Sequence, residues 1–130
     1  MLRTERAGET GDIVVLTLDR PAVRNAINDE LLDALLAAFS SVAAEAVASV
    51  TSVRAVVLRG SGLEAFSAGM DLRERAAFTD EQLRDQHVRI AALIRLVREL
   101  AVPVIACDGA VYPLGYGLDA AGRLLGPPGC

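Results

Sequence analysis

The chain has no lysine and no tryptophan among its 130 residues, and all thirteen of its basic residues are arginine. Without lysine, catalysis through a Schiff base or another lysine amine is excluded within this sequence. Only three Phe and two Tyr are present, and seventeen acidic residues give a formal net charge of −4. Nucleic-acid binding usually needs a basic surface and aromatic rings on which bases stack. The composition therefore argues against a nucleic-acid partner.

Cysteine and histidine are also scarce, with two Cys and one His. With Cys107 and Cys130 as the only thiols, a structural disulfide is not expected. His87 by itself cannot complete a Ser-His-Asp set or a metal site, and we expect no metal and no separate cofactor. Its helical spacing with apolar residues favours a packed or interfacial histidine over a catalytic base.

The sequence shows no sign of export or of a membrane span. Residues 1–12 are polar and mixed in charge, without the apolar core of a signal peptide. The apolar runs are interrupted before the roughly 20 residues that a membrane helix needs. Hydrophobic residues make up 52% of the chain, which is typical of one globular domain. We therefore expect a cytoplasmic protein without a membrane partner.

Hydrophobic periodicity predicts alternating strands and helices, which favours an α/β fold. Asn28 is positioned to cap the first helix, and Thr79 with Gln82 forms a capping box before the second. Strands are expected at residues 13–18, 53–58 and 104–107, and helices from Asp29 to about Val47 and from Asp80 to before Pro103. The apolar face of the second helix is expected to contain Leu83, His87, Ile90, Ile94, Val97 and Leu100.

The segment from Phe66 to Leu72 stands between the middle strand and the charged residues 73–75. A strand, a glycine turn and the start of a helix leave backbone N–H groups without intrahelical partners, and such groups can hold a negatively charged oxygen. An ordinary helix start, with Asp71 as the cap, explains the same residues. Both interpretations are open at this point.

Four separate segments resemble, in their order and spacing, the enoyl-CoA hydratase/isomerase (crotonase) superfamily. They are residues 18–28, 53–60, 65–72 and 103–106, within a match from about Gly11 to about Asp119. The resemblance implies a crotonase-like spiral of β-β-α units, truncated before the C-terminal helical part. It divides the chain into an incomplete N-terminal domain, residues 1–121, and an irregular tail, residues 122–130, which a truncated or frameshifted coding sequence would explain.

The resemblance also implies an activity. Crotonases stabilise a thioester enolate between two backbone N–H groups, which together form an oxyanion hole. We therefore expect an acyl-CoA enzyme of fatty acid metabolism, a lyase or an isomerase, with coenzyme A as part of the substrate. The family implies a homotrimer or hexamer, although the trimer-forming part is missing here. The alternative is a catalytically inactive fragment or a partner-binding subunit.

Individual site residues follow from the resemblance. One oxyanion donor maps to the Met70 N–H. Arg24 corresponds to a contact with the nucleotide end of CoA, and a solvated surface arginine is the alternative. The residues expected to bind acyl-CoA are Arg24, Ala26, Ala68, Gly69, Met70, Asp71, Leu72, Arg73 and Gly115.

The second oxyanion donor lies where the sequence departs from the family pattern. Residues 109–119 fit that pattern only with a two-residue insertion, which places the Tyr116 or Gly117 N–H as donor and Asp119 as acid/base. Without the insertion, Leu114 takes the donor position and Gly117 the acid position. Tyr116 also puts a large side chain where the family keeps the backbone bare. An ordinary solvated or helix-capping role is the alternative for Asp119.

Overall fold

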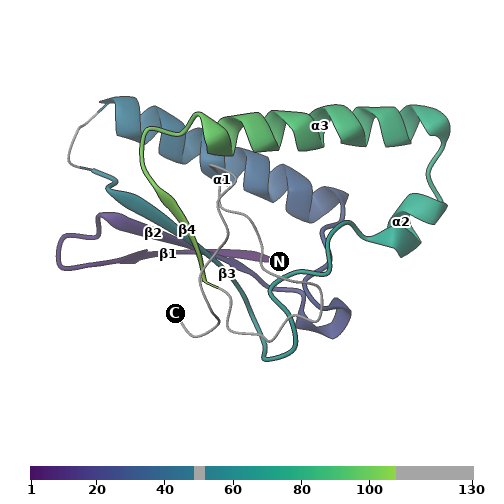
Figure 1. The fold of residues 1–130 in the computed structure, drawn as a ribbon, viewed down its shortest axis with the longest axis horizontal. Coiled ribbons are helices and arrows are strands. Elements are labelled where there is room, and N and C mark those ends of the chain that lie inside the picture. Colours follow the sequence, from purple (N-terminus) through teal and green to yellow (C-terminus); the bar gives the residue numbers. More distant parts are fainter. Residues whose placement is uncertain (49–51, 108–130) are drawn as a thin grey trace.

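The computed structural model describes residues 1–48 and 52–107, which form a sheet with two long helices over one face (Figure 1). The elements in chain order are β1 (Leu2–Ala7), β2 (Ile13–Leu18), the 3-10 helix η1 (Pro21–Val23), α1 (Asp29–Ala48), β3 (Ala55–Gly60), α2 (Leu72–Ala76), α3 (Asp80–Arg98) and β4 (Val104–Cys107).

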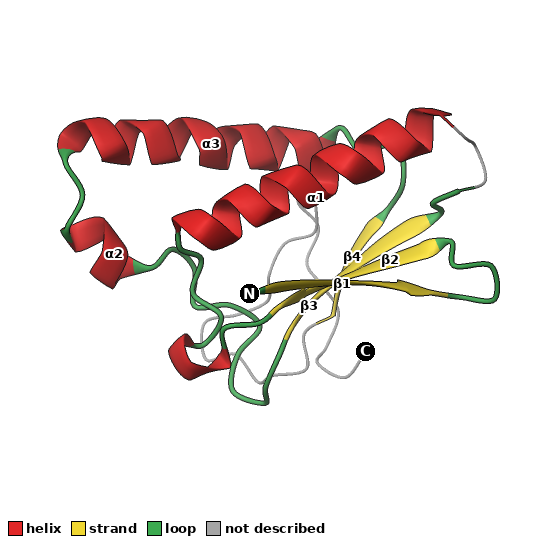
Figure 2. Cartoon of the chain, turned by 180° about the vertical axis from the view of Figure 1, so that it is seen from behind, coloured by secondary structure: helices red, strands yellow, loops and turns green. Residues whose placement is uncertain are grey.

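The sheet has four strands in the order β1-β2-β3-β4. β1 runs antiparallel to β2, whereas β2, β3 and β4 are parallel to one another. Parallel neighbours need a long crossover, and α1 provides it between β2 and β3 while α2 and α3 provide it between β3 and β4. Figure 2 shows α1 and α3 on the same side of the sheet. The predicted α/β class is confirmed.

The core lies between α1 and the sheet. Asn28 caps α1, because its Oδ1 accepts a hydrogen bond from the Leu31 N–H at 2.9 Å. Phe39 on α1 and Leu16 on β2 are at most 1% exposed. The other residues of this cluster are Val14, Leu18, Leu31, Leu35, Val42, Val53 and Val56. The predicted start and length of α1 are confirmed.

By length and composition alone, α1 is also apolar enough to cross a membrane, which the interrupted apolar runs did not lead us to expect. The buried core helix of a globular domain passes the same test, because its sheet-facing side chains are apolar. In this structure that face of α1 packs on β2 and β3.

The capping box at the start of α3 is confirmed. Thr79 Oγ1 accepts from the Gln82 N–H at 3.2 Å, and Gln82 Oε1 accepts from the Thr79 N–H at 2.8 Å. The predicted apolar face is wrong in part, because His87 is exposed and Ile94 is 53% exposed. The side chains that pack on the core are Leu93, Leu96, Val97 and Leu100.

Polar contacts explain why α3 turns a different face toward the core than the apolar pattern predicts. Gln86 is fully buried, and its Nε2 donates to Asp29 Oδ1 at 2.6 Å. Arg89 donates to Asp29, Asp33 and Asp85 at 2.8–2.9 Å. Burial acts to lower the pKa of the Arg89 guanidinium, but the three carboxylates outweigh it and raise that pKa overall. A pattern that counts only apolar residues does not include this polar contact between α1 and α3.

Two strands also differ from expectation. β3 spans Ala55–Gly60 rather than residues 53–58, although Val53 belongs to the core. β1 was not predicted, because its side chains are mostly polar and exposed. As the edge strand of the sheet, β1 is held by backbone pairing to β2, from Leu2 opposite Leu18 to Ala7 opposite Ile13.

Candidate functional site

The segment that leads into α2 runs beside the loop before α1. The Ile27 N–H donates to Gly69 O at 2.8 Å, the Asp71 N–H donates to Ile27 O at 2.9 Å, and Ile27 and Met70 form a parallel bridge. The Ala68 N–H adds a bond to Arg24 O at 2.9 Å. Both segments are loops near the N-terminal end of α1 (Figure 2). Residues more than 40 positions apart in sequence thus form one short ladder.

This bridge turns the Met70 N–H away from Ile27. Ile27 bonds the carbonyl before Met70 and the amide after it, so the N–H and C=O of Met70 itself point away from Ile27. Within the described residues, the Met70 N–H donates no hydrogen bond. By contrast, the Gly69 N–H donates to Ser67 Oγ at 3.1 Å. The Met70 N–H is therefore a backbone donor that a negatively charged oxygen can accept from.

Asp71 serves as the N-cap of α2. Its Oδ1 accepts from the N–H groups of Arg73 and Glu74, at 3.1 and 3.2 Å. α2 has only five residues, and these two amides of its first turn are already bonded. The ordinary-cap interpretation is therefore right for them. What distinguishes the segment is the Met70 N–H just before the cap.

Arg20 completes the surroundings of Asp71. Arg20 Nη1 lies 3.1 Å from Asp71 Oδ2, and the two side chains are 18% and 14% exposed. The backbone N–H of Glu74, followed by the Arg20 guanidinium, holds the pKa of the Asp71 carboxyl below its usual value. Asp71 is thus an anchored carboxylate.

The lowered pKa of Asp71 predicts a loss of stability in acid. A group whose pKa is lower in the folded protein contributes stability above its unfolded pKa, about 3.9 for Asp, and loses it as the pH falls through the folded value. We expect the free energy of unfolding to fall below about pH 4 with a shallower slope in Asp71→Asn than in the parent. Urea unfolding from about pH 6 to pH 2.5 measures this slope. The control is Asp80→Asn, at the exposed start of α3, and equal slopes in Asp71→Asn and the parent would contradict the prediction.

Asn25 was not predicted as part of the site, yet it organises the loops around it. It is fully buried, has a φ of 54°, and its Oδ1 accepts from the Arg20 N–H at 2.9 Å. Its Nδ2 donates to Ser61 O at 2.9 Å and to Ala65 O at 3.0 Å. The one signal in the sequence was an Asn in a turn after Pro21, because Asn tolerates left-handed backbone better than most residues.

The other residues predicted to bind acyl-CoA differ in their exposure to solvent. Arg24 is 70% exposed, and its Nε lies 3.5 Å from Glu64 Oε2, as the surface-arginine alternative describes. Ala26 is buried, and its carbonyl accepts from Arg20 Nη1 at 2.6 Å. Ala68, Gly69, Leu72 and Arg73 are exposed around Met70. The ladder therefore brings the predicted residues of both loops together, and their contact with CoA stays a prediction.

The predicted second half of the site lies outside the described residues. Gly115, Tyr116, Gly117 and Asp119 all fall in residues 108–130, as do the boundary at residue 121 and the tail. In the described part of the chain, no group of three or more His, Cys, Asp or Glu side chains could hold a metal ion.

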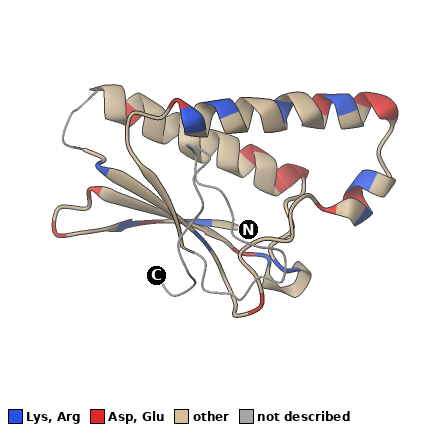
Figure 3. Ribbon diagram, viewed as in Figure 1, with Lys and Arg blue, Asp and Glu red and all other residues tan. Residues whose placement is uncertain are grey.

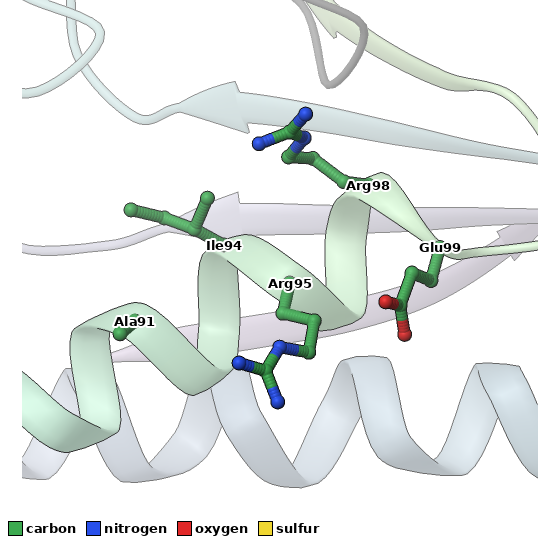
Figure 4. Close-up of a pocket in the computed structure, with 5 residues that line it drawn as sticks. All are labelled: Ala91, Ile94, Arg95, Arg98 and Glu99. Carbon is green, nitrogen blue, oxygen red and sulfur yellow. The ribbon is translucent and has the colours of Figure 1, made fainter.

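A surface hollow occurs elsewhere on the molecule. It encloses about 570 Å³ and is lined by Ala91, Ile94, Arg95, Arg98 and Glu99 of α3 (Figure 4). Figure 1 places the end of α3 away from the loop that leads into α2. Figure 3 shows acidic and basic residues interspersed along α3. The hollow includes none of the predicted site residues.

The fold and the ladder together define a class of protein: an α/β protein with an unbonded backbone N–H, among its described residues, in the loop between a parallel strand and a short capped helix. The family model for enoyl-CoA hydratase/isomerase matches residues 8–121. This chain therefore belongs to the enoyl-CoA hydratase/isomerase family, and its sheet and helices are those of the N-terminal part of the crotonase fold.

Individual relatives agree with the family match. An enoyl-CoA isomerase/hydratase of Zymoseptoria tritici is 36% identical over 115 residues, which is 88% of this chain and 37% of that protein. The crystal structure of enoyl-CoA hydratase from Bacillus anthracis matches with a TM-score of 0.74 and 31% identity, over 84% of this chain and 40% of that one. The enoyl-CoA hydratase structure from Mycobacterium smegmatis matches with a TM-score of 0.71 and 40% identity, over 81% and 38%. The chain spans about two fifths of the length of these relatives.

Proposed function

We propose that this chain binds acyl-CoA thioesters and supplies one donor of the oxyanion hole in a reaction of the enoyl-CoA hydratase/isomerase type. Removing a proton from the α-carbon of a thioester, or adding a nucleophile at its β-carbon, places negative charge on the thioester oxygen. A preorganised backbone N–H aimed at that oxygen stabilises the enolate more than it stabilises the substrate. The Met70 N–H, which the bridge turns away from Ile27, is the observation that supports this proposal.

The remaining roles complete the proposal. The exposed residues Ala68, Gly69, Leu72 and Arg73 surround Met70 and contact the acyl-CoA. The second donor is the N–H of Tyr116 or Gly117, and Asp119 is the acid/base. A cytoplasmic location, a place in fatty acid metabolism and a trimeric or hexameric assembly belong to the same proposal. Hydration and isomerisation share this enolate chemistry, so the fold alone does not select between them.

Calorimetry on the monodisperse 130-residue chain tests the proposal with two ligands. One is crotonyl-CoA, and the other is its thioether analogue, which has a CH2 in place of the carbonyl but keeps the four-carbon chain and CoA. A backbone hydrogen bond to that oxygen should make the thioester bind about threefold to tenfold more tightly. Equal affinities for the two ligands would contradict the role of the Met70 N–H, and no binding of either would reject the acyl-CoA site.

A backbone variant makes the same test sharper. Met70→Pro removes the N–H and should abolish the preference for the thioester, whereas Met70→Leu keeps the N–H and should retain it. Proline restricts the residue before it, and Gly69 has a φ of 88°, so the folding of Met70→Pro is checked by circular dichroism. If that variant is unfolded, the ligand comparison on the parent chain decides.

The alternative function is a partner-binding subunit without catalytic activity. It is favoured by the exposed apolar side chains Ile94 and Ile105, at 53% and 47% exposure. A folded, monodisperse chain that binds neither CoA ligand would support this alternative.

A further inference from the structure

We infer that Arg20 is a positioning residue, whose guanidinium fixes the direction of the Met70 N–H. The inference rests on the proposed oxyanion role of that N–H. It adds a side chain that sequence reasoning had assigned no role of its own, because Arg20 is distant from Met70 in sequence and belongs to the loop after β2.

The geometry places one nitrogen across the end of the Ile27–Met70 bridge. Arg20 Nη1 donates to Ala26 O at 2.6 Å and to Asp71 Oδ2 at 3.1 Å. Ala26 directly precedes Ile27, and Asp71 directly follows Met70. The guanidinium therefore ties together the two backbone segments whose pairing turns the Met70 N–H away from Ile27.

Arg20 is itself held in place at its backbone. Its N–H donates to Asn25 Oδ1, and its carbonyl accepts from the Asn25 N–H, both at 2.9 Å. Asn25 is fully buried. Because the backbone of Arg20 is bonded to this buried residue, the guanidinium can keep Asp71 in one position instead of moving with it.

The peptide plane between Gly69 and Met70 is where this control acts. Gly69 has a φ of 88° and no side chain, and nothing lies within 4 Å of where its Cβ would be. No side-chain contact at Gly69 therefore holds the plane, whose position depends on the Ile27 bonds and on Asp71. Without the Arg20 contact to Asp71, this peptide plane should rotate more freely. The Met70 N–H would then no longer point steadily toward the thioester oxygen. Arginine suits this position, since its planar fork can donate in two fixed directions.

Arg20→Met tests the inference, with Arg3→Gln as the matched control. Arg3 also pairs with an aspartate, at 3.1 Å from Asp19 Oδ2, but that pair is 51% and 35% exposed and lies outside the ladder. We expect Arg20→Met to lose the threefold to tenfold preference for crotonyl-CoA over its thioether, while its affinity for the thioether stays within about twofold. Arg3→Gln should keep the parent preference, and Arg20→Lys should restore part of it.

A purely structural role predicts a different pattern. If Arg20→Met weakens the binding of both ligands by the same factor, or changes neither affinity, the preference for crotonyl-CoA is kept and the positioning role is wrong. If Arg20→Met does not fold, Arg20→Lys replaces it, and the expected result is then a preference smaller than that of the parent, with the affinity for the thioether unchanged.

Failure of the proposed function is distinguishable from failure of this inference. If the parent binds neither ligand, the acyl-CoA proposal fails. The ¹H–¹⁵N resonance of the Met70 amide then tests, without a ligand, whether Arg20 positions this N–H. A shift of that resonance in Arg20→Met but not in Arg3→Gln supports the positioning role. An unchanged Met70 resonance overturns it.

Discussion

Asn25→Ala is expected to lower the free energy of unfolding by about 3 kcal/mol or more. The substitution leaves Ser61 O, Ala65 O and the Arg20 N–H without the amide that now pairs with them. Each buried polar group left without a partner costs about 1–3 kcal/mol. Alanine also tolerates the φ of 54° less well than asparagine does. Urea unfolding followed by circular dichroism measures the change.

The neighbouring residue provides the control for Asn25→Ala. Arg24 has nearly the same backbone, with a φ of 53°, but its side chain is 70% exposed and, among the described residues, pairs only with Glu64. Arg24→Ala should therefore cost less than about 0.5 kcal/mol. A second variant, Asn25→Asp, keeps an acceptor for Arg20 but turns carboxylate oxygen toward two carbonyls, and should be destabilising as well. Similar losses for Arg24→Ala and Asn25→Ala would show that the side-chain bonds contribute little.

Gly60→Ala is expected to destabilise the chain by more than about 2 kcal/mol. A Cβ at this last residue of β3 would lie 2.3 Å from Phe66 O, 2.9 Å from Phe66 Cα and 2.7 Å from Asn25 Nδ2. Two of these atoms are backbone, so the start of the Phe66–Asp71 segment has to move. We therefore expect the variant to lose affinity for crotonyl-CoA as well as stability, as measured by urea unfolding and calorimetry.

Gly11→Ala is the matched control for Gly60→Ala. Gly11 has a φ of 68°, but the nearest atom to its missing Cβ is Arg6 Cβ at 3.8 Å, an ordinary contact. Its substitution should cost only the backbone penalty, about 1–2 kcal/mol, and leave ligand affinity unchanged. If Gly60→Ala binds crotonyl-CoA as tightly as the parent does, the close approach of β3 to Phe66 does not shape the site.

Several features of the fold could be predicted because they depend on near neighbours in sequence. β2 and β4 have the predicted limits, since β-branched and apolar residues are enriched in buried strands. The caps of α1 and α3 follow from Asn28 and Thr79, whose side chains bond amides only three residues away. Periodicity over three or four residues placed α1 correctly.

Other features could not be predicted from local pattern. The edge strand β1 exposes charged side chains and depends on its pairing to β2. α3 turns a different face to the core than predicted, because buried Gln86 and partly buried Arg89 contact α1, and His87 is left exposed. In a sequence, charged and amide residues are assigned to the surface, because their burial is favourable only when their hydrogen bonds are satisfied and the sequence does not show their partners.

By itself, the sequence determined the family and the order of β2, α1, β3, α3 and β4, because motifs and periodicity are properties of short stretches. The resemblance to that family also named Met70 as the candidate donor. The tertiary structure alone decided how Met70 is presented. Arg20 and Asp71 are 51 residues apart, and Asn25 bonds Ser61 and Ala65 across 36 and 40 residues. Such contacts form only when the crossover through α1 returns the chain to the same end of the sheet, and the direction of the Met70 N–H results from that closure.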